Sequence, residues 1–156
     1  MTAALSLVAA FLNGLRLARW AGERTFSEPL VLILHIAYAF VAIGFLLLAL
    51  GILLPNVVAT SGALHGWTAG AIGLMTLAVM TRASLGHTGQ ALTATASIQF
   101  IYGAATLAAC ARIAAAFDIQ REPMLHISAT SWVLAFLGFV VVYAPLLLRP
   151  PQEQSK

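Results

Sequence analysis

Long apolar stretches separated by short polar breaks make up almost the whole chain. A helix that crosses a bilayer needs about 20 mostly apolar residues. The pattern predicts an all-α, polytopic transmembrane helix bundle with about five spans. These spans cover approximately residues 2–19, 29–54, 62–82, 91–117 and 124–148. Residues 1–149 therefore form one predicted bundle, followed by a predicted disordered tail over residues 150–156.

The first of these stretches is the least regular. Residues 2–17 are apolar but few, and Asn13 and Arg16 lie among them. The stretch lacks the basic start and the small-residue cleavage site of a secretory signal peptide. We interpret it as a spanning helix, with a processed or artificial segment as the alternative.

The amino-acid composition indicates that lipid, rather than water, surrounds most of this bundle. Hydrophobic residues make up 61% of the chain and charged residues 8%, whereas a soluble domain has about 45–50% and about 25%. The mean hydropathy of +0.94 agrees with a chain surrounded largely by lipid. These values exclude an ordinary water-soluble domain, a disordered chain and a nucleic-acid-binding tail. The predicted partner is the lipid bilayer, and no nucleic acid is expected.

The few basic residues predict how the bundle is oriented. Cytoplasmic loops of membrane proteins carry an excess of Lys and Arg. One predicted face carries Arg112 and Arg121, and the opposite face, which includes the C-terminus, carries Arg16, Arg19, Arg24, Arg82, Arg149 and Lys156. The N-terminus is therefore predicted outside and the C-terminus in the cytoplasm. Because the loops are short, any function is expected within the bundle or on its surface.

Four histidines lie near the ends of the predicted spans. The predicted topology pairs His35 with His87 on the cytoplasmic side and His65 with His126 on the outer side. An unpaired polar group inside a membrane costs several kcal/mol, and imidazole is a common ligand of haem iron and copper. His35, His65 and His87 are therefore candidate metal ligands. The alternative for each is an interfacial histidine that hydrogen-bonds a headgroup or a carbonyl.

Two further features lie near these histidines. Gly62, Gly66 and Gly70 recur every four residues beside His65 and make a smooth strip. Such a strip favours either close helix packing or room for a flat macrocycle. Arg82 is either a cytoplasmic membrane anchor or a forked donor for a haem propionate or another anion.

The sequence offers no arrangement of residues that predicts catalysis. It contains no Ser-His-Asp pattern, phosphate-binding loop or CxxC motif, and its five acidic residues lie in loops or the tail. A proton-carrying carboxylate in mid-membrane is therefore absent from the predicted spans, and we predict no reaction.

The chain resembles the NnrS family over nearly its whole length. The most specific segments are HGWTAGAIG at residues 65–73 and MTRASLGHTG at residues 80–89. Shorter similarities are LRLARW at 15–20, EPL at 28–30, LHIAYA at 34–39 and YAPLLLRP at 143–150.

This resemblance implies a bacterial inner-membrane protein that binds haem and copper and acts in the response to nitric oxide or nitrosative stress. His35, His65 and His87 match motif positions and become the implied metal ligands. Arg82 joins them as an implied cofactor-binding residue, and nitric oxide is the implied small ligand. Family members are far longer, and only their C-terminal part is similar. A missing N-terminal half or a second copy of the chain is therefore an expected partner. Gln90 also stands where the family commonly has a basic residue.

Two other function classes stay open at this point. A structural or transport-type bundle would use its histidines only at the membrane interface. A cytochrome b-like electron-transfer subunit would need two histidines on facing helices at one depth.

Overall fold

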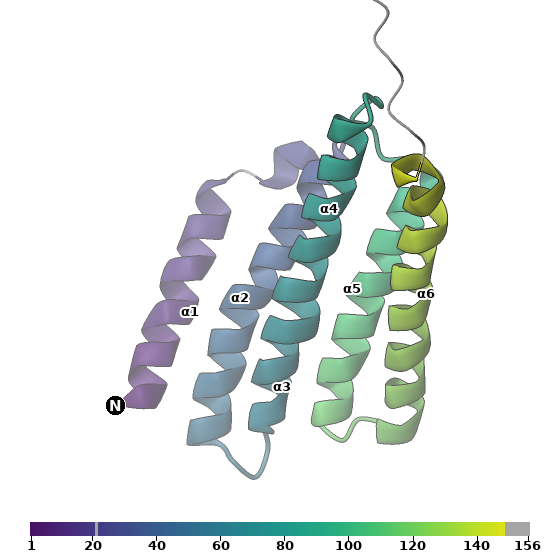
Figure 1. The fold of residues 1–156 in the computed structure, drawn as a ribbon. Coiled ribbons are helices and arrows are strands. Elements are labelled where there is room, and N and C mark those ends of the chain that lie inside the picture. Colours follow the sequence, from purple (N-terminus) through teal and green to yellow (C-terminus); the bar gives the residue numbers. More distant parts are fainter. Residues whose placement is uncertain (21, 149–156) are drawn as a thin grey trace, which may run out of the picture.

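The structure is a computed structural model that describes residues 1–20 and 22–148, and within these residues it is all-helical, with no strand (Figure 1). The predicted fold class is confirmed. The elements, in chain order, are α1 (Thr2–Arg19), the 3₁₀ helix η1 (Gly22–Thr25), α2 (Pro29–Leu53), α3 (Thr60–His65), the π-helix η2 (Gly66–Gly73), α4 (Leu74–His87), α5 (Ala96–Ala116) and α6 (Arg121–Leu147). The elements α3, η2 and α4 follow one another without a break and form one long rod.

Four helices of the described chain are long and apolar enough to cross a membrane: Pro29–Leu53, Thr60–His87, Ala96–Ala116 and Arg121–Leu147. We predicted about five spans, and α1 forms a helix over its predicted residues but is not among these four. The orientation in the membrane stays a prediction. The predicted tail over residues 150–156 lies outside the described residues.

The helix that corresponds to the third predicted span extends further than we predicted. We predicted its end at Arg82, followed by a loop that carries His87, but α4 continues to His87. The helix tolerates Arg82 because that side chain is exposed. Its end is fixed by the hydroxyl of Thr88, which donates to the carbonyl of Ser84 at 2.6 Å. Gly89 then turns the chain with a φ of +68°, a conformation that glycine adopts at little cost.

Two later boundaries differ for local reasons as well. The helix α5 begins at Ala96 because the Thr95 side chain accepts a hydrogen bond from the backbone N–H of Ile98 and so caps the helix. The helix α6 begins three residues earlier than predicted, at Arg121. Pro123 then lies in its first turn, where a proline needs no backbone donor.

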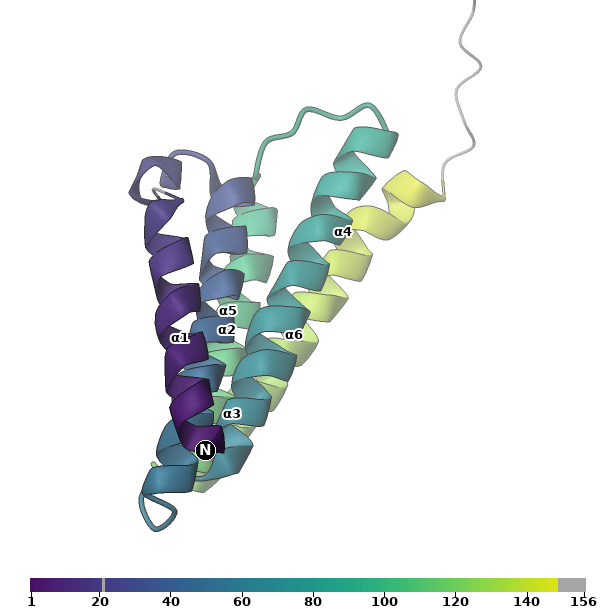
Figure 2. The ribbon, with the colours of Figure 1, turned by 90° about the vertical axis from the view of Figure 1, so that its left-hand side faces the viewer.

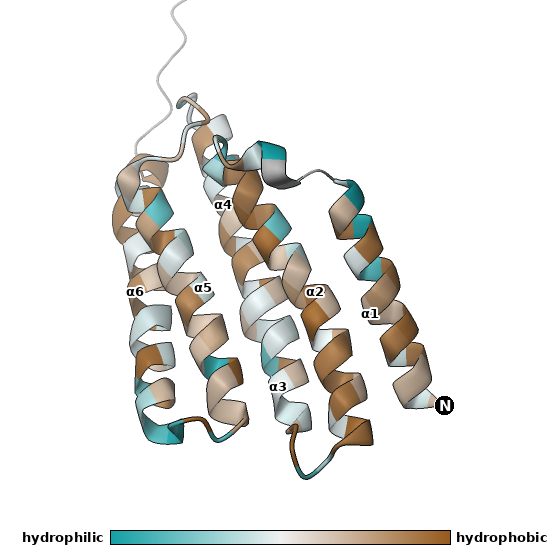
Figure 3. Ribbon diagram, turned by 180° about the vertical axis from the view of Figure 1, so that it is seen from behind, coloured by the Kyte–Doolittle hydropathy of each residue, from teal (hydrophilic) through white to brown (hydrophobic). Residues whose placement is uncertain are grey.

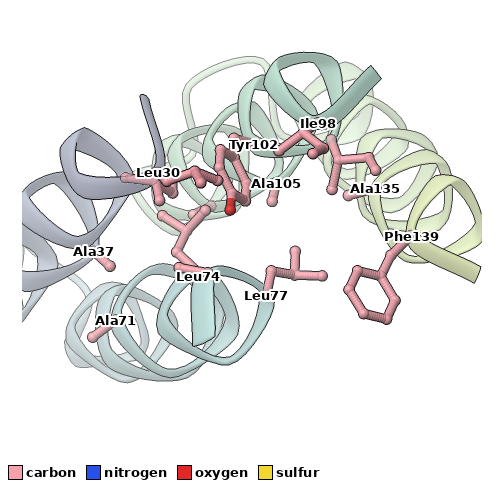
Figure 4. Close-up of a cluster of buried hydrophobic side chains, with 14 of the residues drawn as sticks. Leu30, Ala37, Ala71, Leu74, Leu77, Ile98, Tyr102, Ala105, Ala135 and Phe139 are labelled. Atoms are coloured by element: carbon pink, nitrogen blue, oxygen red, sulfur yellow. The ribbon is translucent and has the colours of Figure 1, made fainter. Parts of the chain in front are cut away.

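The helices pack as a layered bundle with α1 at its edge. Figure 1 shows α1 beside α2, the rod α3–η2–α4 next to it, and α5 paired with α6. In the view of Figure 2, α4 and α6 diverge from α1 and α2 toward the end of the bundle at which α4 ends. The main core lies where α2, α4, α5 and α6 meet. There, Leu74 and Leu77 of α4 point toward Tyr102 of α5 and Phe139 of α6 (Figure 4).

The glycines of the rod serve close helix packing. A Cβ added at Gly66 would lie 3.5 Å from the Cα of Gly44, so these two backbones nearly touch. Gly70 faces the ring of Phe40, and Gly44 faces the indole of Trp67. The glycine strip is therefore filled by α2 and, at Gly62, also by Ala116 and Phe117 at the end of α5, and it leaves no room there for a macrocycle.

The outward surface matches a lipid environment. Figure 3 shows hydrophobic colours over much of α1 and α2, paler colours along α3 and part of α6, and the strongest hydrophilic colours mainly near helix ends. On α6, for example, Val133, Leu137, Val140 and Val141 are all more than half exposed. Apolar side chains at these positions are stable in lipid, because the bilayer interior is itself apolar.

Candidate functional site

The predicted metal ligands do not converge on one site. His35 lies near the start of α2 and His87 is the last residue of α4, whereas His65 ends α3 near the opposite end of the bundle (Figure 1). His87 and Arg82 are exposed, and His35 and His65 are half-buried. Among the described residues, no group of three His, Cys, Asp or Glu side chains lies together as metal ligands.

The first site is a cluster of polar and aromatic side chains between α1 and α2, which we call the α1–α2 cluster: Asn13, Arg16, Trp20, His35 and Tyr38. The Trp20 ring stands edge-on to the His35 ring, at 5.9 Å between centroids and 88°. It also packs 4.7 Å from the Tyr38 ring. The Arg16 guanidinium lies 5.4 Å from the Trp20 ring centroid and 5.8 Å from that of Tyr38. These cation–π contacts hold the charge of Arg16 at the edge of the cluster.

A side-chain hydrogen bond joins the two helices deeper in the cluster. The Tyr38 hydroxyl donates to the Oδ1 atom of Asn13 at 2.6 Å. The Asn13 amide donates in turn to the carbonyl of Ala9 at 2.8 Å. Both polar side chains are therefore satisfied within the protein, which makes an asparagine tolerable in an apolar helix.

His35 retains one unsatisfied atom. Its Nδ1 lies 3.1 Å from the carbonyl oxygen of Val31. Because a carbonyl only accepts, this bond places the proton on Nδ1 and leaves a lone pair on Nε2. The Nε2 atom is buried and has no hydrogen-bond partner. Gly22 packs on the same ring, since a Cβ added there would lie 2.9 Å from Cδ2 of His35. The cluster thus contains a covered acceptor without a donor.

The face of α2 that carries His35 explains why His87 is not its neighbour. Ile33, Ala37 and Phe40 are buried in the main core. His35 lies on the opposite side of the helix from these residues and contacts Trp20 of the α1 side. The predicted pair of His35 and His87 is therefore not brought together.

The second site is a pocket of about 320 Å³ near the other end of the bundle, which we call the His65 pocket. It is lined by residues from α3, η2, α5 and α6: His65, Thr68, Ala69, Arg112, Leu125, Ser128, Ala129 and Trp132. His65 thus shares a face with Thr68 and Ala69, as the helical spacing predicts. The π-helix η2 supplies two of these residues, and such helices often occur at functional sites.

The hydroxyl groups of this pocket already donate to backbone carbonyls. Thr68 donates one turn back to the carbonyl of Leu64 at 2.8 Å. The buried Ser128 donates to the carbonyl of Ala108 on α5 at 2.9 Å. Each hydroxyl has a single proton, so neither can donate to a molecule in the pocket.

A third polar feature lies in the core. The hydroxyl oxygens of Thr81, Tyr102 and Tyr143 are buried and have no hydrogen-bond partner. Thr81 lies next to both phenols, yet no pair of these groups has hydrogen-bond geometry. They come from α4, α5 and α6, so the sequence alone could not have grouped them.

Sequence reasoning also missed Trp20, Tyr38 and Arg112 as site residues. Arg112 could have been found, because an ionisable residue inside an apolar span is a functional candidate by default. Trp20 and Tyr38 gave no such indication, since their importance depends on how α1 packs on α2.

Comparison with known proteins identifies the family. The family model described as NnrS protein matches residues 1–150. No curated protein and no solved structure matches the chain. The match covers nearly the whole sequence, and this membership supports a protein of the nitric-oxide-response type. The chain belongs to the NnrS family.

Proposed function

We propose that this protein binds haem through His35 and acts in the response to nitric oxide or nitrosative stress. The observation that carries the proposal is the buried, unpartnered Nε2 atom of His35. A ligating histidine typically donates its other ring N–H to a carbonyl or carboxylate, which fixes the tautomer and the orientation of the ring. The bond from Nδ1 to Val31 has this form. Haem, when bound, would supply an iron centre able to bind nitric oxide.

The chain's own residues set the conditions for this binding. Trp20 and Gly22 pack against the His35 ring, so a cofactor reaches Nε2 only when they move away. His87 and Arg82 are exposed at the same end of the bundle. Arg82 is our candidate for a propionate partner, whereas His87 is given no role as a second ligand because it is not brought together with His35.

Copper has weaker support from the described residues. A copper centre usually takes three or more protein ligands, and no group of three His, Cys, Asp or Glu lies together in the described chain. The proposal is therefore made for haem, with copper measured in the same samples.

The test compares two histidine variants of the purified membrane protein. Haem would be measured by its Soret absorbance, and iron and copper by mass spectrometry. We expect His35→Ala to lose most of the bound haem and His126→Ala to retain it, because His126 is exposed on α6. Equal haem in both variants, or no haem in the unchanged protein, would contradict the proposal.

The same experiment separates the two alternative functions. A structural or transport-type bundle predicts that His35→Ala alters stability without any change in a haem spectrum. A cytochrome b-like site needs a second histidine facing the first, but His35 faces α1, which contains none.

We also propose the bacterial inner membrane as the location, with the C-terminus in the cytoplasm. The connection between α2 and α3 then lies outside and the one between α4 and α5 lies inside. With the single cysteine Cys110 replaced by alanine, Asn56→Cys should react with an impermeant maleimide on intact cells, and Gln90→Cys should not. The reverse labelling would overturn this orientation.

A further inference from the structure

The His65 pocket contains a positive charge with no acidic neighbour. Arg112 is half-buried in α5, four residues before the helix ends at Ala116. Its Cα is therefore only about 6 Å along the helix axis from that end. No acidic residue lines the pocket in the part of the chain that the structure describes. A guanidinium inside an apolar span is costly unless something compensates its charge.

The polar side chains of the pocket that remain free offer N–H donors, and His65 adds one N–H and one acceptor nitrogen. The hydroxyls of Thr68 and Ser128 give their protons to backbone carbonyls. Arg112 has five N–H groups and no acceptor capacity, and the Trp132 indole has one N–H. Neither these groups nor the His65 ring forms a hydrogen bond to another described side chain or carbonyl. A wall with free donors, a fixed positive charge and no acid is complementary to an anion.

From this arrangement we propose that the His65 pocket binds an oxyanion, a carboxylate or a phosphate-type group, with Arg112 as its principal partner and His65 and Trp132 beside it. The planar guanidinium fork matches two oxygens of such a group. The same guanidinium disfavours a metal cation at His65, since like charges repel. The proposal is independent of haem binding at His35, which lies toward the other end of the bundle.

Two sources can supply this chemistry. The pocket begins near the end of the bundle that α3, α5 and α6 share, since Arg112 lies four residues before Ala116 and Leu125 four residues after Arg121, and it extends inward to Trp132. At that depth either a soluble anion from the aqueous side or a phospholipid headgroup reaches Arg112. The two sources can be separated experimentally. Removing the lipid removes a bound headgroup, whereas dialysis removes a bound soluble anion.

The test uses the full chain purified in an uncharged maltoside detergent. Sodium formate or sodium phosphate would replace sodium chloride stepwise at constant ionic strength, and the midpoint of thermal unfolding would be followed. A ligand that binds only the folded state raises this midpoint. Phospholipid that copurifies with the protein would be quantified in parallel by mass spectrometry.

Arg112→Gln removes the charge, and Arg82→Gln is the matched control because Arg82 is an exposed arginine near the other end. We expect Arg112→Gln to weaken the apparent affinity for the added anion by roughly tenfold or more, and Arg82→Gln to leave it unchanged. If phospholipid is the source, added anions have no effect, and copurified phospholipid falls in Arg112→Gln alone.

A third variant tests the proposal if Arg112→Gln does not fold. Arg112→Lys keeps the charge but lacks the fork, so it should fold and bind the anion more weakly than the unchanged protein. Anion protection and lipid content that are the same in all three variants would overturn the proposal. Haem content serves as a separate measurement, and we expect it to be unaffected by Arg112→Lys.

Discussion

His35 and His65 are both half-buried imidazoles near opposite ends of the bundle, but their surroundings leave different atoms without a partner. At His35, Nδ1 is hydrogen-bonded to the carbonyl of Val31, and the buried Nε2 atom keeps a lone pair without a partner. The nearby Arg16 guanidinium lies against the Trp20 and Tyr38 rings. At His65, the hydroxyls are already bonded, and the free groups are a guanidinium and N–H donors around an open pocket. A lone pair without a donor suits a metal, whereas a guanidinium and free N–H groups without a carboxylate suit an anion.

The residue type alone therefore does not determine the chemistry of a membrane histidine. The same imidazole becomes a candidate metal ligand beside a carbonyl and an aromatic ring, and a candidate anion partner beside an arginine. The neighbours that decide this come from other helices in both cases: Trp20 in the first and Arg112 in the second.

The largest effect is expected at a close contact between α2 and η2 that lies outside both regions. Gly44 lies against the indole of Trp67, and that indole is held by a hydrogen bond of 3.2 Å to the carbonyl of Val41. Gly44→Ala therefore forces the ring or the helix to move, at a cost of about 1–3 kcal/mol. Thermal unfolding in detergent would measure this loss of stability.

The control for this change is Gly103→Ala in α5. A Cβ added at Gly103 would meet no atom within 4 Å, and alanine favours a helix over glycine by about 1 kcal/mol. We expect a neutral or slightly stabilising result. If both variants lowered stability equally, close packing at Gly44 would not be the cause.

The next effect concerns access to the two histidines. Diethylpyrocarbonate acylates unprotonated imidazole nitrogens, and modified peptides can be counted by mass spectrometry. His65 lines an open pocket, whereas Nε2 of His35 is covered. We therefore expect His65 to react faster in the unchanged protein. Trp20→Ala should raise the rate at His35 severalfold and leave the rate at His65 unchanged. A Trp20→Phe variant, which retains a ring, should show a smaller increase.

Helix existence could be predicted from the sequence because the apolar runs are long, and five of them correspond to α1, α2, the α3–η2–α4 rod, α5 and α6. Boundaries were less accurate. The end of α4 depends on the side-chain bond of Thr88, and hydropathy does not detect a single cap. The π-helix was not predicted either, although three glycines between residues 66 and 73 indicated an unusual backbone.

The candidate sites could be predicted only in part. The apolar runs singled out His35, His65 and His87 because each is a polar residue near the end of a predicted span. Their partners remained unknown, since helical spacing gives the neighbours on one helix and not those across a helix interface. Arg112 shows this limit most clearly. From the sequence, Arg112 is only a topological charge, whereas in the fold it lies in one pocket with residues of α3, η2 and α6.

A smaller effect is expected for the hydrogen bond that ties α1 to α2. Tyr38→Phe removes the donor to Asn13 and should cost about 1 kcal/mol, the usual net contribution of a hydrogen bond. A double-mutant cycle with Asn13→Ala would isolate the pair, because the second change should cost less once the first is made. Additive effects would show that the two side chains do not stabilise the folded state together. Anion binding at the His65 pocket should not change in either variant.

The smallest effect is expected at Ser128, although it lines the His65 pocket beside Arg112. Its proton is donated to the carbonyl of Ala108, so Ser128→Ala removes no donor from the pocket. Stability should fall by about 1 kcal/mol or less, while the affinity for the added anion changes by less than about twofold. The anion titration described for Arg112→Gln measures both quantities. A loss of affinity as large as that of Arg112→Gln would mean that the hydroxyl turns toward the anion, and the distinction between occupied hydroxyls and free N–H donors would then fail.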